Sequence, residues 1–225
     1  MKALSDQFRM AVADYLYLLE KGYSQTTILK LVGDRYQLPG EERSMLMRGL
    51  CGMEACNIRK QKTVNEIPDG STLYIDGYNV IRTLGSYFLG KMLFISMDGF
   101  LRDASEMHRK TLPVKIKQKC IHEMLDYLTK LKPGTIMIYL DEPVSKSGEL
   151  ASGLNDLMTD RGLEGRAVTM HSPDHHLKKV SQGIVCSADS SIIDQCNTSV
   201  FDLPRAILET HYQPRLIRLD AMNEG

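Results

Sequence analysis

The sequence predicts an α/β protein in which a small helical domain, residues 1–64, precedes an α/β/α domain, residues 65–225, with a mainly parallel sheet. Two observations predict this class. The first part of the chain carries only the apolar spacing of amphipathic helices, whereas beyond it short apolar runs alternate with helical ones. Runs such as Ile136 to Leu140 are continuously apolar, which is typical of parallel strands that are covered on both faces.

The first domain is expected to hold three helices. Residues 3–21 repeat apolar side chains at helical spacing, a second helix lies between Ser24 and Gly33, and a third starts at Pro39. This order is compatible with a helix-turn-helix that binds nucleic acid and equally with a plain three-helix bundle. Without a basic recognition helix, only nonspecific phosphate contacts are expected here. The polar residues 59–70 are the predicted domain boundary.

The second domain alternates strands and helices, so parallel strands would present their carboxyl ends at one edge of the sheet. Strands are expected at residues 73–75, 135–141, 166–170, 183–189 and 199–201, and helices at residues 78–88, 113–131, 150–161, 191–196 and 204–211. An Asp98-Gly99 turn between apolar runs predicts a hairpin of residues 91–96 and 100–103. Residues 171–182 are expected to form a polar loop.

Three of the predicted strands end in an aspartate: Asp76, Asp141 and Asp189. Clustered carboxylates repel one another, so they stay ionised together only if a cation lies between them. An all-oxygen ligand set suits Mg²⁺ or Mn²⁺. Such an ion lowers the pKa of a bound water and offsets charge on a phosphate, which points to phosphodiester hydrolysis. An aspartate after a strand also commonly caps the next helix, so for each residue taken alone that interpretation stays open.

Several neighbours of these aspartates are candidates for supporting roles. Asn79 could hold a metal-bound water or a phosphate oxygen, or could be an ordinary residue of a helix N-terminus. Asp194 reaches the site only if Asp189 still belongs to the strand end, and Asp98 is explained by its turn. Substrate contacts are expected from Asn79, Arg82, Arg102, Ser145 and Ser147. A zinc site at His171, His175 and His176 is disfavoured because their spacing fits no usual ligand set.

The charge and the cysteine content of the chain say less about its function. The chain has 28 Lys+Arg and 28 Asp+Glu, so its net charge says nothing about partners. No apolar run is long enough for a membrane span, and the first residues lack the apolar core of a signal peptide. Five scattered cysteines, an odd number, favour buried reduced thiols and a cytoplasmic location.

At Tyr74-Ile-Asp76-Gly-Tyr-Asn79 the sequence resembles the opening motif of the PIN-like nuclease superfamily, especially its NYN branch. Ser187-Ala-Asp189 and Leu140-Asp141 resemble two later acidic strand ends of that group. More closely, nearly the whole chain is similar to a prokaryotic family in which a helical DUF434 domain precedes a DUF5616 domain. The patches that carry this similarity include Asp98-Gly-Phe-Leu-Arg102-Asp103 and Ser187-Ala-Asp189-Ser-Ser-Ile-Ile-Asp194.

The resemblance implies a PIN-like (Rossmann-like) α/β/α fold, a Mg²⁺ or Mn²⁺ ion and RNA as substrate. It also makes Asp98, Asp103 and Asp194 plausible site residues, with Asp98 and Asp194 as candidate metal ligands. The hairpin at Asp98 departs from ordinary PIN domains, whose second acid usually lies on a helix. We therefore expect a metal-dependent ribonuclease. Its catalytic residues would be Asp76, Asn79, Asp141 and Asp189, and its metal ligands Asp76, Asp98, Asp141, Asp189 and Asp194.

The alternative is an inactive PIN-like module that binds RNA or protein. A phosphatase or nucleotide-binding enzyme is disfavoured, because the chain lacks an Asp-x-Asp motif at Asp76 and a Gly-x-x-x-x-Gly-Lys loop. RNA is the expected partner, no membrane association is expected, and a homodimer is left open.

Overall fold

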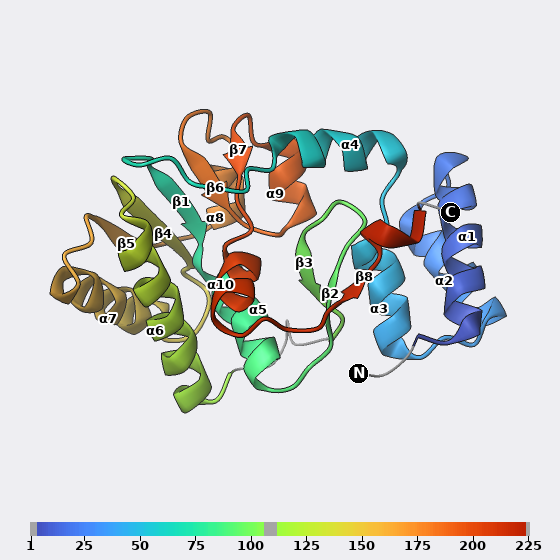
Figure 1. Ribbon diagram of the computed structural model, residues 1–225, viewed down its shortest axis with the longest axis horizontal. Coiled ribbons are helices and arrows are strands. Elements are labelled where there is room, and N and C mark those ends of the chain that lie inside the picture. The colour runs from blue at the N-terminus through green and yellow to red at the C-terminus, as the bar shows by residue number, and fades with distance from the viewer. Residues whose placement is uncertain (1–3, 106–111, 224–225) are drawn as a thin grey trace. The chain divides into compact units, whose positions relative to one another are not determined.

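The computed structural model describes residues 4–105 and 112–223 (Figure 1). The chain divides into two compact units. The first unit comprises Met1–Gln61, Ser86–Lys110 and Pro214–Gly225, and the second comprises Lys62–Gly85 and Thr111–Gln213. Each unit is therefore built from segments that are not contiguous in the sequence.

The first unit begins with four helices, where the sequence predicts three. They are α1 (Asp6–Glu20), α2 (Gln25–Arg35), α3 (Gly40–Gly49) and α4 (Met53–Lys62, whose last residue belongs to the second unit). Ser5 and Ser24 cap α1 and α2, each through a side-chain oxygen that accepts a backbone N–H. Helix α4 was not predicted because it buries only Cys56 and Arg59, so it carries almost no apolar pattern.

The predicted hairpin is confirmed, and it belongs to the first unit. Strands β2 (Leu93–Ile95) and β3 (Leu101–Asp103) pair antiparallel, and Gly99 takes a φ of +89° in the turn, where a side chain would be strained. A third strand, β8 (Ile217–Arg218), runs parallel to β2, and the short helix η2 (Asp220–Asn223) follows it. Phe94 and Leu219 pack with the buried residues of the helices in one apolar core.

The second unit holds a five-stranded sheet of order β5-β4-β1-β6-β7 in which every pairing is parallel. This confirms a mixed α/β fold with a helical N-terminal region and a mainly parallel sheet. The strands are β1 (Leu73–Asp76), β4 (Ile136–Asp141), β5 (Gly165–Met170), β6 (Ile184–Cys186) and β7 (Ser199–Val200). The helices are α5 (Gly77–Phe88, which begins here), α6 (Val114–Leu131), α7 (Ser147–Asp160), α8 (Pro173–Leu177), α9 (Ser190–Gln195) and α10 (Leu203–His211).

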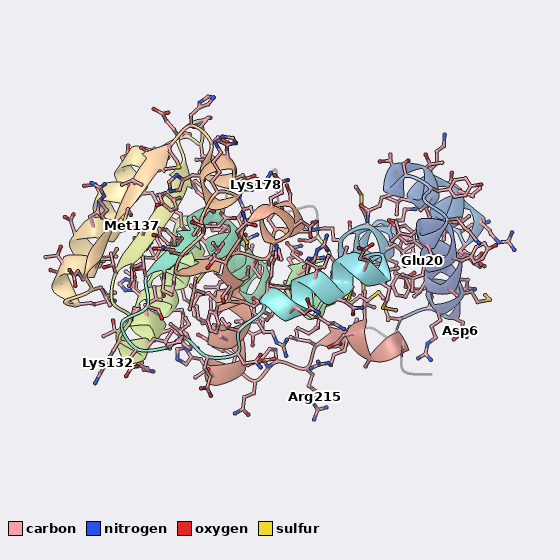
Figure 2. The ribbon with its side chains drawn as sticks, turned by 90° about the horizontal axis from the view of Figure 1, so that it is seen from above. Asp6, Glu20, Lys132, Met137, Lys178 and Arg215 are labelled. Atoms are coloured by element: carbon pink, nitrogen blue, oxygen red, sulfur yellow. The ribbon has the colours of Figure 1, made fainter. Side chains whose placement is uncertain are left out.

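The two faces of this sheet are covered unequally. Ile75, Ile138 and Leu140 are fully buried on one face. Figure 1 shows α6 and α7 running alongside β4 and β5. Alternate residues point to the other face, where Met137, labelled in Figure 2, stays half-buried. On that second face Asp76 pairs in register with Tyr139.

Residues 171–182 are not the plain polar loop that the sequence predicts. Pro173 starts the short helix α8 at a position where its missing N–H costs nothing, and Pro173 and Leu177 are both buried. These two apolar residues, four apart in a polar stretch, fix the helix against the sheet. Among the described residues, no helix has the length and apolar character needed to cross a membrane.

Candidate functional site

Asp76 is the last residue of β1, and its side chain is buried although it carries a carboxylate. One carboxylate oxygen accepts a hydrogen bond from the backbone N–H of Asn79 at 3.2 Å, and the other accepts one from the Ser187 hydroxyl at 3.0 Å. Burial raises the pKa of Asp76 to about 7; the two hydrogen bonds oppose this, and nearby Asp174 and Asp189 add to it. The site is therefore centred on a buried acid whose ionised form is disfavoured.

Gly77 allows α5 to begin directly against β4. A Cβ at this position would lie 2.7 Å from the Leu140 side chain and 3.0 Å from the Tyr139 carbonyl oxygen. Any larger residue would push the first turn of α5 away from the sheet. The Asp-Gly pair thus places both Asp76 and Asn79 at the carboxyl end of β1.

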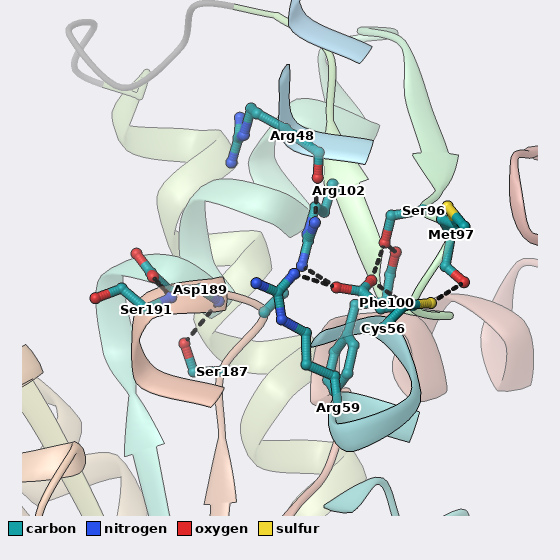
Figure 3. Close-up of polar contacts among 12 residues, drawn as sticks. Arg48, Cys56, Arg59, Ser96, Met97, Phe100, Arg102, Ser187, Asp189 and Ser191 are labelled. Atoms are coloured by element: carbon teal, nitrogen blue, oxygen red, sulfur yellow. Dashed lines mark hydrogen bonds and ion pairs between the residues drawn. The ribbon is translucent and has the colours of Figure 1, made fainter. Parts of the chain in front are cut away.

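The segment after β6 supplies the second carboxylate. The Asp189 N–H donates to the Ser187 hydroxyl at 3.1 Å, and the Asp189 carboxylate accepts the Ser191 N–H at 2.7 Å (Figure 3). Asp189 therefore does cap α9, as the simpler interpretation expects. The Asn79 side-chain oxygen accepts the Ala188 N–H at 3.1 Å and ties α5 to this segment.

Two more carboxylates lie near this pair: Asp174 interacts with both of its members, and Asp141 interacts with Asp174. Asp141 ends β4 and is half-buried, and Asp174 lies exposed on α8, which follows β5. Partial desolvation by the neighbouring residues raises the pKa of Asp174, and the negative charges of Asp189 and Asp141 raise it further. Asp174 thus interacts electrostatically with all three predicted acids, Asp76 included. Sequence reasoning missed Asp174, although its place shortly after the predicted strand of residues 166–170 was the available signal.

Positive charge lies at two points beside these four carboxylates. The Arg82 guanidinium lies 5.3 Å from the centre of the Tyr78 ring. The pKa of Tyr78 is raised by burial and by the charge of Asp141, and Arg82 opposes this, so the ring lies between Asp141 and Arg82 in its electrostatic influences. Lys178, after α8, lowers the pKa of Asp174 against the other influences. Arg82 was a predicted substrate contact, whereas Lys178 and Tyr78 were not predicted.

The remaining predicted residues of the second unit lie in other settings. Asp194 and Ser145 are exposed. Ser147 is buried at the start of α7, and its hydroxyl donates to the Glu142 carbonyl oxygen at 3.0 Å, so it serves the local turn. The side chain of His176 lies 3.0 Å from the Tyr139 hydroxyl, and His171, His175 and His176 are all exposed.

Asp98 and Arg102 belong to the first unit, where they form a buried ion-pair cluster. One oxygen of Asp98 accepts from Arg59 at 2.9 Å and from Arg102 at 2.7 Å. The other accepts the Ser96 hydroxyl at 2.5 Å and the Phe100 N–H at 3.4 Å. Figure 3 shows Arg59, Ser96 and Arg102 from this cluster. Burial acts to raise the pKa of Asp98, but the two arginines and Ser96 outweigh it and lower the pKa.

Both oxygens of Asp98 are thus engaged by donors, and Arg102 also donates to the Arg48 carbonyl oxygen. These contacts favour a structural counter-ion role for Asp98 and Arg102. The predicted roles in metal and substrate binding stay predictions.

The chemistry of the four aspartates fits a hard divalent cation, because their oxygens are strong anionic ligands and their mutual repulsion would be relieved by one. Within residues 4–105 and 112–223, however, no three His, Cys, Asp or Glu side chains are arranged as a ready metal site. The described cysteines Cys51, Cys56, Cys120, Cys186 and Cys196 are all buried free thiols.

Comparisons with known proteins place the chain in a family. Residues 65–206 match the family model described as "Domain of unknown function (DUF5616)", and residues 7–62 match "Protein of unknown function (DUF434)". The chain belongs to the DUF434/DUF5616 family. It is 30% identical over 202 residues to "Uncharacterized protein MJ0935" of Methanocaldococcus jannaschii, an alignment that covers 88% of this chain and 95% of that protein. No solved structure matches the chain. Asp76, Asp141, Asp174 and Asp189 all lie within the DUF5616 match.

Proposed function

We propose that this DUF434/DUF5616 protein is a metal-dependent ribonuclease whose α/β region is PIN-like. The observation that carries the proposal is the buried Asp76, whose pKa is raised to about 7 and which interacts with the charges of Asp174 and Asp189. Strongly perturbed carboxylates at the carboxyl edge of a parallel sheet are typical of functional sites. A fold stabilised only by packing would gain nothing from gathering four acids there.

Asp76, Asp141, Asp174 and Asp189 would hold a Mg²⁺ or Mn²⁺ ion. When bound, the ion would lower the pKa of a coordinated water and offset the charge of the phosphate. The residues that surround it have separate tasks. Asn79, fixed by its bond from Ala188, keeps its side-chain N–H donors for a substrate oxygen. Arg82 and Lys178 supply positive charge to adjacent phosphates of the strand.

The alternative function is that of an inactive PIN-like module that binds RNA or protein. One observation favours it: among the described residues, no three potential ligands are arranged to hold a metal ion. In addition, Asp189 already serves as the cap of α9, and Asp76 is held by two hydrogen bonds. A module of this kind would use Arg82 and Lys178 to bind and would leave the strand intact.

Cleavage of labelled RNA distinguishes the two functions. The purified full chain is incubated with a single-stranded RNA and with a DNA of the same sequence, in Mn²⁺, in Mg²⁺ and in EDTA. We expect RNA products only when the metal is present. Asp141→Asn is the test variant, because Asp141 is half-buried and its replacement should leave the fold intact.

Asp156→Asn, an exposed aspartate on α7, is the matched control and should cleave like the unmodified protein. Loss of cleavage in Asp141→Asn with retained RNA binding supports the enzyme. RNA binding by all three proteins without metal-dependent products supports the inactive module and overturns the nuclease proposal.

A further inference from the structure

A pocket lies in the first unit, whereas the four aspartates belong to the second unit. It has a volume of about 360 Å³. Its walls come from the first turn of α3, the end of α5, the segment leading into β2 and the segment leading into β8. The lining residues are Glu41, Tyr87, Gly90, Lys91, Met92, Leu93, Pro214, Arg215, Leu216 and Ile217.

Two positively charged side chains, Lys91 and Arg215, line this pocket. Lys91 and Arg215 are both exposed, and within the described residues neither side chain donates a hydrogen bond or forms an ion pair. Figure 2 shows the Arg215 side chain extending away from the ribbon into solvent. A lysine and an arginine that flank one pocket are suited to a phosphate group, since both donate charge-assisted hydrogen bonds to its oxygens.

The other walls match the remaining parts of a nucleotide. Tyr87 offers an aromatic surface, and Leu93, Pro214 and Ile217 offer aliphatic ones, so a flat heterocycle could lie against them. Glu41 also lines the pocket and carries an acidic side chain, the residue type that contacts the ribose in dinucleotide-binding folds.

The size of the pocket limits the ligand further. Small-molecule sites usually measure about 300 to 1,000 Å³, so 360 Å³ lies near the lower end and fits one nucleotide better than two. We propose that this pocket binds a single nucleoside monophosphate, with its phosphate between Lys91 and Arg215 and its base against Tyr87. The proposal is independent of the four aspartates and of any cleavage.

The test measures binding of four ligands, the 5′-monophosphates of adenosine, guanosine, cytidine and uridine, beside inorganic phosphate and adenosine. Isothermal titration calorimetry on the full chain gives each Kd. We expect at least one nucleotide to bind more tightly than phosphate or adenosine. Lys91→Gln and Arg215→Gln should each raise the Kd of that nucleotide roughly tenfold, because each removes a charged donor to the phosphate.

Lys30→Gln on α2 is the matched control, since it removes an exposed positive charge from the same unit. It should leave the Kd unchanged. Tyr87→Leu should raise the Kd of the nucleotide and leave the Kd of inorganic phosphate unchanged. If no nucleotide binds better than phosphate, or if Lys30→Gln weakens binding as much as Arg215→Gln, the proposal is overturned.

A final comparison identifies the source of the nucleotide. A short RNA with a 5′-phosphate is titrated beside the same RNA with a 5′-hydroxyl. Equal affinity for the mononucleotide and the 5′-phosphorylated strand assigns the pocket to strand ends. If the mononucleotide binds and neither strand does, the pocket is assigned to the free nucleotide. Both results support a nucleoside-monophosphate site.

Discussion

The hydroxyl of Ser187 donates a hydrogen bond to the buried carboxylate of Asp76, although 111 positions separate these residues in the chain. The contact exists because β6 pairs directly with β1 in the sheet, so Ser187 follows the strand that lies beside Asp76. Asp76 is therefore held from two sides, by β6 and by the first turn of α5. Its ionisation should accordingly be linked to the stability of the fold.

Replacement of Asp76 by asparagine should change how stability depends on pH. The pKa of Asp76 rises from an ordinary value of 3.8 to about 7 in the folded protein, so the folded state binds a proton that the unfolded state has lost. Between these values the free energy of unfolding should fall by about 1.4 kcal/mol per pH unit as pH rises. Asp76→Asn removes this contribution, and its amide can still accept the Asn79 N–H.

Urea unfolding at several pH values between 4 and 8 measures the effect. We expect Asp76→Asn to show a shallower decline with pH and to be more stable than the unmodified protein at pH 8. Asp156→Asn, an exposed aspartate on the same unit, should follow the unmodified protein. Parallel pH profiles for all three proteins would show that Asp76 ionises normally.

The main sheet was predictable because its physical signals are local. Strands such as β4 are continuously apolar and end in an acid, and Lys132-Pro133-Gly134 separates β4 from the helix before it. That Asp76, Asp141 and Asp189 end strands at one edge of the sheet followed from topology, since parallel strands place their carboxyl ends together. Asp174 was not predicted as a site residue because its helix, α8, was not predicted. This helix has only five residues and depends on two buried apolar side chains.

The composition of the first unit was not predictable from local pattern. Strand β8 has two residues and forms only because β2 offers an edge, a pairing across more than a hundred positions. The sequence likewise does not reveal that the hairpin of β2 and β3 joins the core of the N-terminal helices through Phe94. The sequence explains Asp98 by its turn alone. It does not reveal the ion pairs of Asp98, because the two arginines that neutralise it come from separate elements, α4 and β3.

Gly77→Ala should destabilise the protein by about 1 to 3 kcal/mol, the usual cost of overpacking. Its Cβ would meet Leu140 and the carbonyl oxygen of Tyr139, and backbone at that distance cannot move aside easily. Gly153→Ala is a sharp control, because nothing lies within 4 Å of its added Cβ in the interior of α7. Gly153→Ala should stabilise the protein by about 0.5 to 1 kcal/mol, since alanine is a better helix former than glycine.

Chemical denaturation of both glycine variants measures these changes. Opposite signs for Gly77→Ala and Gly153→Ala are the expected result. Equal stability of the two variants would mean that α5 can begin further from β4 than the structure shows.

Asp98→Asn should be among the most damaging single changes in the first unit. It leaves Arg59 and Arg102, both buried, without the carboxylate that they share, and breaking a buried ion pair costs about 3 to 5 kcal/mol. The lowered pKa of Asp98 means that this stabilisation is present above its ordinary value of 3.8 and is lost as pH falls through the folded value.

Thermal and urea unfolding at pH 7 and at pH 3 measure both effects. Asp34→Asn, which breaks the more exposed pair with Arg43, is the control and should cost at most about 1 kcal/mol. A cost for Asp98→Asn no larger than that of the control would contradict a structural role for the cluster.

Lys62→Met should loosen α9 while the rest of the second unit stays folded. The Lys62 ammonium donates to three carbonyl oxygens near the end of this helix: Ile193 at 2.8 Å, Asp194 at 3.1 Å and Cys196 at 2.8 Å. A positive charge at a helix C-terminus is worth up to about 2 kcal/mol when it is partly buried. Methionine keeps the length of the side chain and removes only the charge and the donors.

Native-state hydrogen exchange should therefore show faster exchange of the Ile193 and Cys196 amides, with protection of β1 and β4 unchanged. Lys60→Met, which removes an exposed charge from the same helix, is the matched control and should leave α9 protected. Because Asp189 caps the opposite end of α9, Lys62→Met should also weaken Mn²⁺ binding if Asp189 is a ligand. Weakened Mn²⁺ binding by Lys62→Met, but not by Lys60→Met, would link the order of this helix to the carboxylate site. Unchanged exchange in α9 would show instead that the lysine contributes nothing to its stability.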